Sequence, residues 1–365
     1  AEGACYSALD ADSEGEEGRF YVWTKEELQR VLGEDFAFAE KYYSIGRAAA
    51  WEHGTNILLR EGDDTFMARQ LGLSVEELRA RATRVNDLLL AERSKRVRPG
   101  LDDKSLTSWN ALMVMAWCDA YGTLGDHRSL EHARKTMGLI LTKCRREEGG
   151  LSHNYKDGKA SINGYLEDYG FTIEALLALY SATFEEHWVT EARALADHAI
   201  AHFLDRSTGM FWFTSDLDPP LIARKAEVMD NVIPSSNSSM CKALFILGHL
   251  LDEQDYIGIG TRQLNNVEPG MERYPSGYGN WMQAMLMRVY PWYEVAITGP
   301  QALELRKEFG THYVPNAIFL GTVGTSELPL LAEKTVGAST TIFVCENKVC
   351  RLPVNTVSGA MALME

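Results

Sequence analysis

The stretch YLEDYGFTIEALLALYSAT at residues 165–183 decides the fold class of this chain. Its apolar side chains recur at spacings of three and four, which is the period of one helical face. These apolar residues are Leu166, Tyr169, Ile173, Leu176, Leu177 and Tyr180. The same spacing recurs at 105–122, so the sequence predicts long amphipathic helices.

The predicted helices come in pairs with short connections. The expected pairs are 105–122 with 126–146, 165–183 with 188–204, and 237–252 with 255–266, followed by a further helix at 278–290. Two helices joined by a short loop must lie antiparallel. Stacked hairpins of this kind form a solenoid or close into a toroid.

The segment before these helices mixes acidic turns, short strands and helices. A strand is expected at 18–23, and two capping boxes predict helix starts, one pairing Thr24 with Glu27 and one pairing Ser74 with Glu77. We expect the second of these helices to run to about Arg93.

After the paired helices, the sequence predicts a strand–helix–strand–helix–strand series with a few parallel strands. The expected elements are 293–299, 300–310, 315–321, 326–334 and 340–345. The predicted organisation is a mixed α/β segment of the toroid domain with long rim loops at 1–100, paired helices at 101–292, and a small α/β appendage at 293–365.

Composition excludes several classes of protein. The 365 residues are 45% hydrophobic and 24% charged, which is ordinary for a globular chain, and no stretch approaches the roughly 20 apolar residues of a membrane span. A net charge of -15 disfavours nucleic acid and anionic membranes as partners. Six dispersed cysteines favour a reducing compartment, with the cytoplasm as the default location. Because the sequence opens on Ala1 rather than Met, we expect it to be part of a longer protein.

The loops that precede the first helix of each pair carry acids and aromatic residues. In stacked hairpins these loops open on one rim. The acids expected to gather there are Asp102, Asp103, Glu167, Asp168 and Asp230. The aromatic residues expected nearby are Trp109, Tyr165, Tyr169 and Trp281. Paired carboxylates beside flat aromatic surfaces are what sugar hydrolysis needs, and Asp103 and Asp168 are our first candidates for the acid and base roles.

Further polar residues are predicted to line this site, and a structural reading stays open beside the functional one. The added lining residues are Asn110, Arg224, Asn231 and Asn237. An aspartate at the start of a helix is also a common N-cap, and Trp109 or Tyr169 on an apolar helix face also suits a core position.

Other constellations predict neither a metal nor a cofactor. His198 and His202 have a metal-compatible spacing but no evident third ligand, so we expect a solvated helix face. Cys345 and Cys350 flank a four-residue segment that could turn a β-hairpin and bring the sulfurs within disulfide reach, although we expect reduced thiols.

Five segments carry a resemblance to a known family. They are ACYSALDADSEGEEGRFYVWT, RPGLDDKSLTSWNALM, LEDYGFTIEALLALY, DNVIPSSNS and FVCENKVCRLP. In order along nearly the whole chain, they resemble the YyaL-like, spermatogenesis-associated family of thioredoxin-domain-containing proteins. That resemblance implies an (α/α)6 toroid of the six-hairpin glycosidase type, incomplete in this chain, preceded in the parent protein by a thioredoxin-like domain. The segment DNVIPSSNS departs from the family pattern, with Ile233 where an acid is usual.

Two functions are therefore expected as alternatives. The first is a carbohydrate-active or carbohydrate-binding toroid that uses rim carboxylates, resembling a glycosidase or, with less support, a sugar epimerase. The second is a non-catalytic module that binds a partner, with the thioredoxin-like domain of the same parent protein doing redox work.

Overall fold

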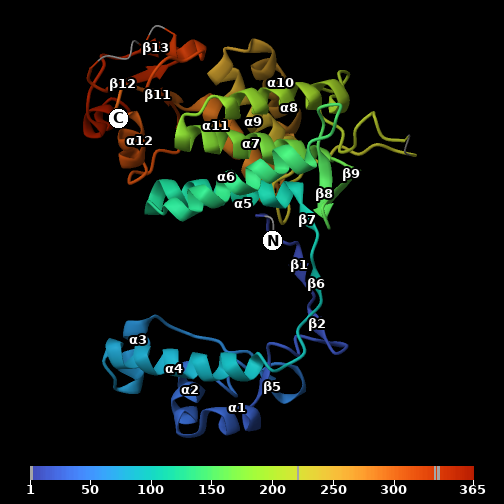
Figure 1. The fold of residues 1–365 in the computed structure, drawn as a ribbon, viewed down its shortest axis with the longest axis vertical. Helices are drawn as coiled ribbons and strands as arrows, with labels where there is room; N and C mark the ends of the chain where they lie inside the picture. Colours follow the sequence, from blue (N-terminus) through green and yellow to red (C-terminus); the bar gives the residue numbers. More distant parts are fainter. Residues whose placement is uncertain (1–2, 220–221, 333, 335–337) are drawn as a thin grey trace. The chain divides into compact units, whose positions relative to one another are not determined.

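A computed structural model describes residues 3–219, 222–332, 334 and 338–365. The chain divides into two compact units (Figure 1). The smaller unit is Ala8–Asp103, and the larger unit comprises Ala1–Ser7 and Lys104–Glu365. Each unit has its own hydrophobic core and is described by itself.

The smaller unit is built from four helices and short strands. Its helices are α1 (Lys25–Leu32), α2 (Phe36–Tyr42), α3 (Asp64–Leu71) and α4 (Val75–Arg93). Its two-residue strands are β1 (Ala8–Leu9), β2 (Asp12–Ser13), β3 (Glu16–Glu17), β4 (Trp23–Thr24), β5 (Thr55–Asn56) and β6 (Leu101–Asp102). The strand predicted at 18–23 is wrong over most of its length, because residues 18–22 form a turn closed by backbone bonds to the Gly18 carbonyl.

Both predicted helix starts in this unit are confirmed. Ser74 and Glu77 form the full capping box, each side chain accepting the other residue's backbone N–H. At α1 only half of the box forms, since the Thr24 hydroxyl accepts the Glu27 N–H at 3.1 Å while the Glu27 carboxylate binds Arg96 at 2.8 Å. The guanidinium of Arg96 therefore competes successfully for the carboxylate that the capping box would use.

The larger unit contains the predicted helical pairs. They are α5 (Thr107–Leu124) with α6 (His127–Leu139), α7 (Leu166–Thr183) with α8 (His187–Phe203), and α9 (Ser236–Leu251) with α10 (Gln254–Arg273), followed by α11 (Gly279–Val289). A π-helical turn, Ile140–Cys144, extends α6, and α10 continues through Pro269 beyond its predicted end. Strands β7 (Ser105–Leu106), β8 (Ser152–Lys156) and β9 (Lys159–Asn163) form a small antiparallel sheet.

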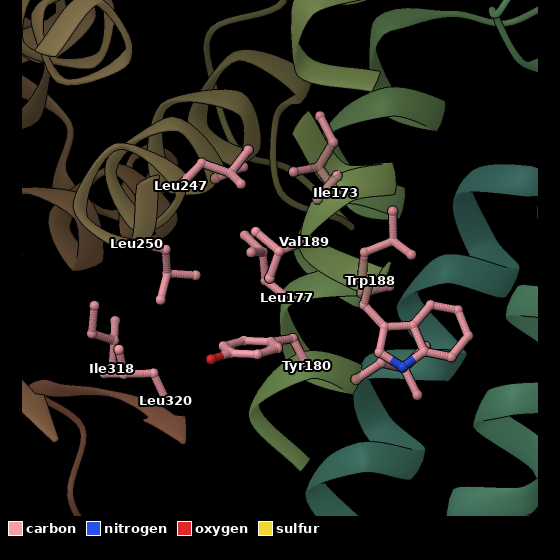
Figure 2. Packing of buried hydrophobic residues seen from close by; sticks show 14 of the residues in the cluster. Ile173, Leu177, Tyr180, Trp188, Val189, Leu247, Leu250, Ile318 and Leu320 are labelled. Carbon is pink, nitrogen blue, oxygen red and sulfur yellow. The ribbon is translucent and has the colours of Figure 1, made fainter. Parts of the chain in front are cut away.

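The helices of each pair pack on one another, and α5, α7, α9 and α11 pack in succession as the shared inner row. This arrangement confirms the mainly α fold of stacked (α/α) hairpins. Helix α7 is the centre of the core, because it is buried along almost its whole length and contacts both α5 and α9. Figure 2 shows Ile173, Leu177 and Tyr180 of α7 among apolar side chains of α8, α9 and the C-terminal sheet.

The C-terminal segment adds a four-stranded mixed sheet to the same core. Its strands are β10 (Tyr293–Thr298), β11 (Ala317–Thr322), β12 (Thr341–Glu346) and β13 (Val349–Cys350), in the order β11-β10-β12-β13. Helices α12 (Ala302–Phe309) and α13 (Val357–Ala362) accompany it. The predicted parallel pairing holds for β10 with β11, whereas β12 and β13 run antiparallel to their neighbours.

Two details of this segment differ from the prediction. The helix expected near 326–334 is a short 3₁₀ turn, Pro329–Leu331, and residue 333 lies outside the described residues. Cys345 and Cys350 face each other across the β12–β13 hairpin and form a disulfide, so the expectation of reduced thiols is wrong. The hairpin itself is as predicted, and its register is what brings the two sulfurs together.

The apolar stretches of this chain are helix faces and strands that pack on other elements. Among the described residues, none of the helices is both long enough and apolar enough to cross a bilayer.

Candidate functional site

Asp168 ties together the N-termini of α5 and α7. Its side chain is fully buried, with Oδ1 accepting the Ser108 N–H at 2.9 Å and Oδ2 accepting the Tyr165 N–H at 2.8 Å. The His153 Nδ1 lies 3.0 Å from Oδ2. Burial raises the pKa of Asp168, while the hydrogen bonds and charge of His153 oppose that rise. Both oxygens of this carboxylate are thus occupied by protein donors.

Asp230 makes the corresponding connection between α9 and α11. Its Oδ1 accepts the Ser235 N–H and the Ser238 hydroxyl, both at 2.8 Å. Its Oδ2 accepts the Asn280 N–H at 2.8 Å. Each of the two aspartates therefore satisfies backbone donors that two neighbouring helices would otherwise leave unpaired at their N-termini.

Two asparagines near these helix N-termini each bind both backbone groups of one residue in a neighbouring segment. The Asn110 Oδ1 accepts the Cys5 N–H at 2.7 Å, and its Nδ2 donates to the Cys5 carbonyl at 3.1 Å. In the same way, Asn237 accepts the Phe211 N–H at 2.8 Å and donates to the Phe211 carbonyl at 2.9 Å. Both asparagines are buried, and each clamps one residue of an extended segment against its helix.

These contacts form a repeated unit of sequence and structure. Ser108-Trp109-Asn110 lies in the first turn of α5, and Ser235-Ser236-Asn237 forms the N-cap and first two residues of α9. In each triplet the serine N–H binds an aspartate, and the asparagine clamps a passing chain. The repeat gives four of the predicted site residues a structural role in holding the rim: Asp168, Asp230, Asn110 and Asn237.

Glu167 differs from its buried neighbour. Its side chain is only partly buried, and its Oε1 accepts a hydrogen bond from the Ser108 hydroxyl at 3.2 Å. Burial, followed by the charge of Asp168, raises the pKa of Glu167 to about 7, and the charge of Glu227 adds to this rise. Glu227 is itself partly buried and accepts the Ser236 N–H at 3.2 Å. Glu167 can therefore carry or release a proton near neutral pH.

His153 on β8 lies beside this pair of acids. The Asp168 hydrogen bond and charge outweigh the effect of burial and raise the pKa of His153. Its ring lies 4.8 Å from that of Tyr165, which stacks on Phe213 at 4.9 Å. The sequence analysis missed His153, although Asp157-Gly158 between alternating residues is a hairpin signal that would have placed it on a strand. It also missed Glu227, for which we find no comparable signal.

Among the described residues, one group of side chains has the spacing of metal ligands. Ligand atoms of His153, Glu167 and Asp168 all lie within 4.8 Å of one another. A cation there would compete with the N–H donors that already occupy Asp168, which makes this carboxylate a poor ligand. These three side chains support proton transfer by Glu167 rather than metal binding.

Asp102 and Asp103 belong to the smaller unit. Asp102 lies on β6, opposite Ala8. Trp109 is 43% exposed and, with Met113, lines an apolar groove of about 360 Å³ beside residues 5–7.

The remaining aromatic candidates are core residues. Tyr169 is buried, and its hydroxyl accepts the Leu151 N–H at 2.9 Å. Trp281 is likewise buried and donates to the Val228 carbonyl at 2.7 Å. Burial raises the pKa of Tyr169 to about 12, so its hydroxyl stays protonated and supports the fold.

The last polar candidates lie around the loop that leads into α9. Arg224 donates to the Thr214 carbonyl and lies over the Trp212 ring at 5.4 Å, whereas Asn231 is exposed. The prediction of a solvated helix face for His198 and His202 is correct for only one of the two. His202 contacts Asp216 at 2.8 Å, but His198 stacks on Tyr169, and burial lowers the pKa of His198 to about 4.

The raised pKa of Glu167 predicts a stability that falls with pH. A carboxyl group whose folded pKa lies above its ordinary value of 4.5 stabilises the fold below that value, and the contribution is lost as pH rises toward about 7. We expect Glu167→Gln to be more stable than the unsubstituted protein at pH 8, by on the order of 2 kcal/mol, and similar at pH 4. Urea unfolding at both pH values measures this, with the exposed Glu272→Gln as the control. A loss of stability at pH 8 would contradict it.

The stacked hairpins and the repeated clamps define a helical-hairpin protein of the (α/α) class with an acidic site at the inner helix N-termini. Among solved structures, the chain is similar to a cellobiose 2-epimerase from Bacillus thermoamylovorans, with 15% identity, 44% of each chain covered and a TM-score of 0.37. It is also similar to a GH76 α-mannanase from Bacteroides thetaiotaomicron, with 14% identity, 62% and 64% covered and a TM-score of 0.43. Each of these likenesses covers only part of the chain.

Comparison of sequences gives the particular relationship. No family model matches the chain. It is 26% identical over 401 aligned residues to spermatogenesis-associated protein 20 of Homo sapiens, covering 96% of this chain and 51% of that protein, and 27% identical to the Mus musculus protein, covering 96% and 50%. The chain is therefore similar to spermatogenesis-associated protein 20 over nearly its whole length, as its sequence motifs predicted. It spans about half the length of these curated relatives.

Proposed function

We propose that the larger unit binds a carbohydrate at the N-termini of its inner helices and acts on it by acid–base chemistry, with Glu167 as the proton donor. The observation that carries this proposal is a partly exposed carboxyl group with a pKa near 7, held between two helix N-termini beside a second acid. Cleavage of a glycosidic bond needs such a protonated acid to donate to the leaving oxygen.

The second acid in the proposal is Glu227. Glycoside hydrolysis needs a carboxylate that attacks or activates water in addition to the proton donor. The charge of Glu227 acts on Glu167, and its backbone hydrogen bond from Ser236 keeps it on the α9 side of the site. This assignment replaces Asp168 as the acid or base. Asp168 becomes the residue that holds His153 and raises the pKa of Glu167.

Tyr165 provides the surface on which a sugar ring could stack. It is the N-cap residue of α7, two positions before Glu167, and is partly buried between His153 and Phe213. Flat aromatic side chains bury the apolar face of a ligand at low entropic cost. We assign Tyr165 the role of substrate platform and leave Asp102 and Asp103, in the smaller unit, as sequence-based candidates only.

The proposal predicts a specific carbohydrate ligand. In a thermal-shift screen of neutral oligosaccharides against the whole chain, we expect at least one to raise the melting temperature by about 2 °C or more. The shift should disappear in Tyr165→Ala and persist in Tyr313→Ala, which removes a tyrosine that is 90% exposed. Product analysis of the stabilising sugar then separates turnover from binding.

The alternative, a partner-binding module in a larger redox protein, predicts a different outcome of the same screen. It rests on the finding that the curated relatives are about twice as long as this chain. If no saccharide stabilises the protein while Tyr165→Ala folds normally, the carbohydrate proposal is wrong. The result would then favour the partner-binding module.

A further inference from the structure

A cavity of about 650 Å³ lies at the C-terminal ends of α9 and α11, away from the helix N-termini that form the candidate site. Its polar and aromatic lining includes His249, Asp252, Arg288, Trp292, Glu294 and Lys348. Lys348 comes from the turn between β12 and β13, so this hairpin supplies one wall of the cavity.

The turn of the hairpin contacts two other residues that line the cavity. The Lys348 N–H donates to the Glu294 Oε2 at 2.9 Å, and the Lys348 ammonium pairs with Asp252 at the end of α9. Glu294 is only 2% exposed, so its carboxylate depends on such partners. The turn residues Asn347 and Lys348 both have positive φ angles, of 49° and 68°, a conformation that is costly for a lysine.

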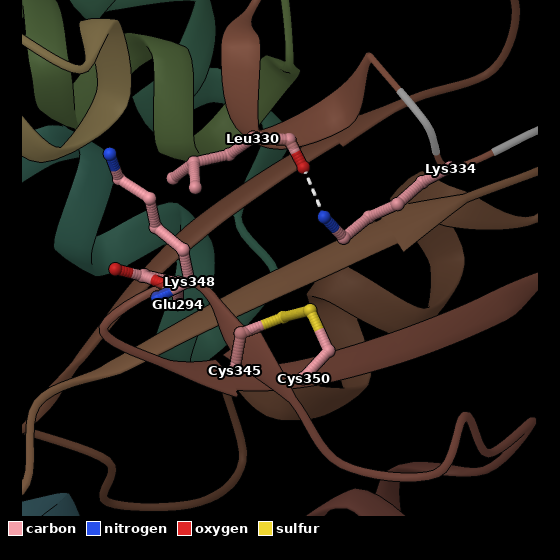
Figure 3. Close-up of a disulfide and its surroundings, with 6 residues drawn as sticks. All are labelled: Glu294, Leu330, Lys334, Cys345, Lys348 and Cys350. Carbon is pink, nitrogen blue, oxygen red and sulfur yellow. Dashed lines mark hydrogen bonds between the residues drawn. A yellow bond between two sulfur atoms is a disulfide. The ribbon is translucent and has the colours of Figure 1, made fainter.

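Strand β13 itself makes few backbone contacts, although the chain after it returns to β12 through the Arg351 N–H on the Val344 carbonyl and a bridge between Val354 and Ile342. Strand β13 is two residues long, lies at the edge of the sheet and pairs only with the end of β12. By contrast, β12 pairs with β10 along six register positions. The Cys345–Cys350 disulfide joins opposite residues of the short pairing, as Figure 3 shows beside Glu294 and Lys348.

The disulfide is poorly suited to stabilise the whole unit. Cys345 and Cys350 are only five residues apart, and a short closed loop constrains the unfolded chain little. Its effect must therefore be mainly local, on the hairpin and on the cavity wall that the hairpin forms.

We propose that the Cys345–Cys350 disulfide is a thiol-reducible clasp that holds the β12–β13 hairpin as a wall of this cavity. Cys350 is exposed, whereas Cys345 is 2% exposed. A thiolate of a small dithiol attacks the Cys350 sulfur, and the S–S bond breaks as Cys345 leaves as a thiolate and takes up a proton. The second thiol of the reagent then displaces Cys350 as a thiol. Two electrons pass from the dithiol to the protein, and the dithiol leaves as a disulfide.

The other cysteines do not compete for this chemistry. Burial raises the pKa of Cys118 to about 12, and it also raises the pKa of Cys144 and of Cys241. These thiols are buried and protonated, and so are slow to react. Cys5 is partly buried, and Cys5→Ser removes it from the experiment.

Hydrogen exchange of the Cys5→Ser protein, oxidised and after treatment with dithiothreitol, tests the clasp. On reduction we expect faster exchange at 347–351, with unchanged protection of the β10–β12 pairing and of α7. Reoxidation should restore the slow exchange. Unchanged exchange at 347–351 after verified reduction would overturn the proposal, and so would loss of protection throughout the unit, which would show that the disulfide stabilises the whole unit.

A matched pair of variants tests which sulfur is attacked. In the Cys5→Ser background, Cys345→Ser leaves the exposed Cys350 thiol, and Cys350→Ser leaves the buried Cys345 thiol. We expect the first variant to react with an aromatic disulfide reagent at least about tenfold faster than the second. Equal rates would contradict the proposed attack at Cys350. Because both variants lack the disulfide, both should also show the fast hairpin exchange of the reduced protein.

Discussion

Replacing Asp168 with alanine is expected to lower the free energy of unfolding of the larger unit by about 3–5 kcal/mol. The substitution leaves the Ser108 and Tyr165 N–H groups without their acceptor and His153 without its carboxylate. Since the carboxylate is fully buried, water does not readily replace it. The loss should appear as a lower midpoint of urea unfolding at an unchanged dependence on urea concentration.

Asp216→Ala is the matched control for this prediction. Asp216 also contacts a histidine, His202, at 2.8 Å, but its side chain is 53% exposed. A surface pair of this kind contributes at most about 1 kcal/mol, so the control should remain within about 0.5 kcal/mol of the unsubstituted protein. Equal small losses in both variants would mean that Asp168 does not hold the two helices together. Asp168→Asn, which keeps one acceptor oxygen, should lie between them.

The paired helices could be predicted because their burial is periodic along the sequence. Helix α7 is apolar on a broad face, and each predicted pair is joined by a loop too short for any other arrangement. The prediction of a strand at 18–23 was wrong because it rested on local residue preference alone. Its aromatic residues suit a strand locally, but Gly18, with a φ of 76°, starts a turn that local propensity does not reveal.

The candidate site was predictable only as a group of acids at one end of the helices. Glu167 and Asp168 are adjacent in sequence and differ by about 100° around the axis of α7. We expected Asp168 to act as acid or base, although the sequence contains nothing that separates it from Glu167. The packing of α5 against α7 decides it, because this packing buries Asp168 between two helix N-termini and leaves Glu167 partly exposed.

The disulfide also could not be predicted from the sequence alone. The sequence placed Cys345 and Cys350 on a hairpin but left their oxidation state to an argument from compartment. Register decides the contact, because the two residues are direct partners across β12 and β13. An argument about where a protein resides cannot replace that local geometry.

The repeated clamps explain how one acid remains available at a rim full of helix N-termini. Asp168 and Asp230 neutralise backbone donors that would otherwise bind any nearby anion, Glu167 included. With those donors occupied, the strongest influences left on Glu167 are burial and the negative charge of Asp168, and both favour its protonated form. The structural aspartates thus prepare the adjacent glutamate to donate a proton.

Glu167→Gln is therefore expected to lower kcat/KM for the stabilising saccharide by about 10²–10⁴. Glutamine has nearly the same shape but cannot donate the carboxyl proton, so binding and the fold should survive. In the unsubstituted protein the active form is the protonated one, and the rate should fall as pH rises above about 7. The residual activity of the variant should lack that decline.

The exposed Glu272→Gln on α10 should keep both the full rate and the pH-dependent decline. If Glu167→Gln retained full turnover, or lost it without changing the pH profile, the proton donor would have to lie elsewhere. Measuring the binding of the same saccharide to both variants separates the two roles of the site. A glutamate that only positions substrate weakens binding on substitution, whereas a proton donor lowers kcat and leaves the dissociation constant nearly unchanged.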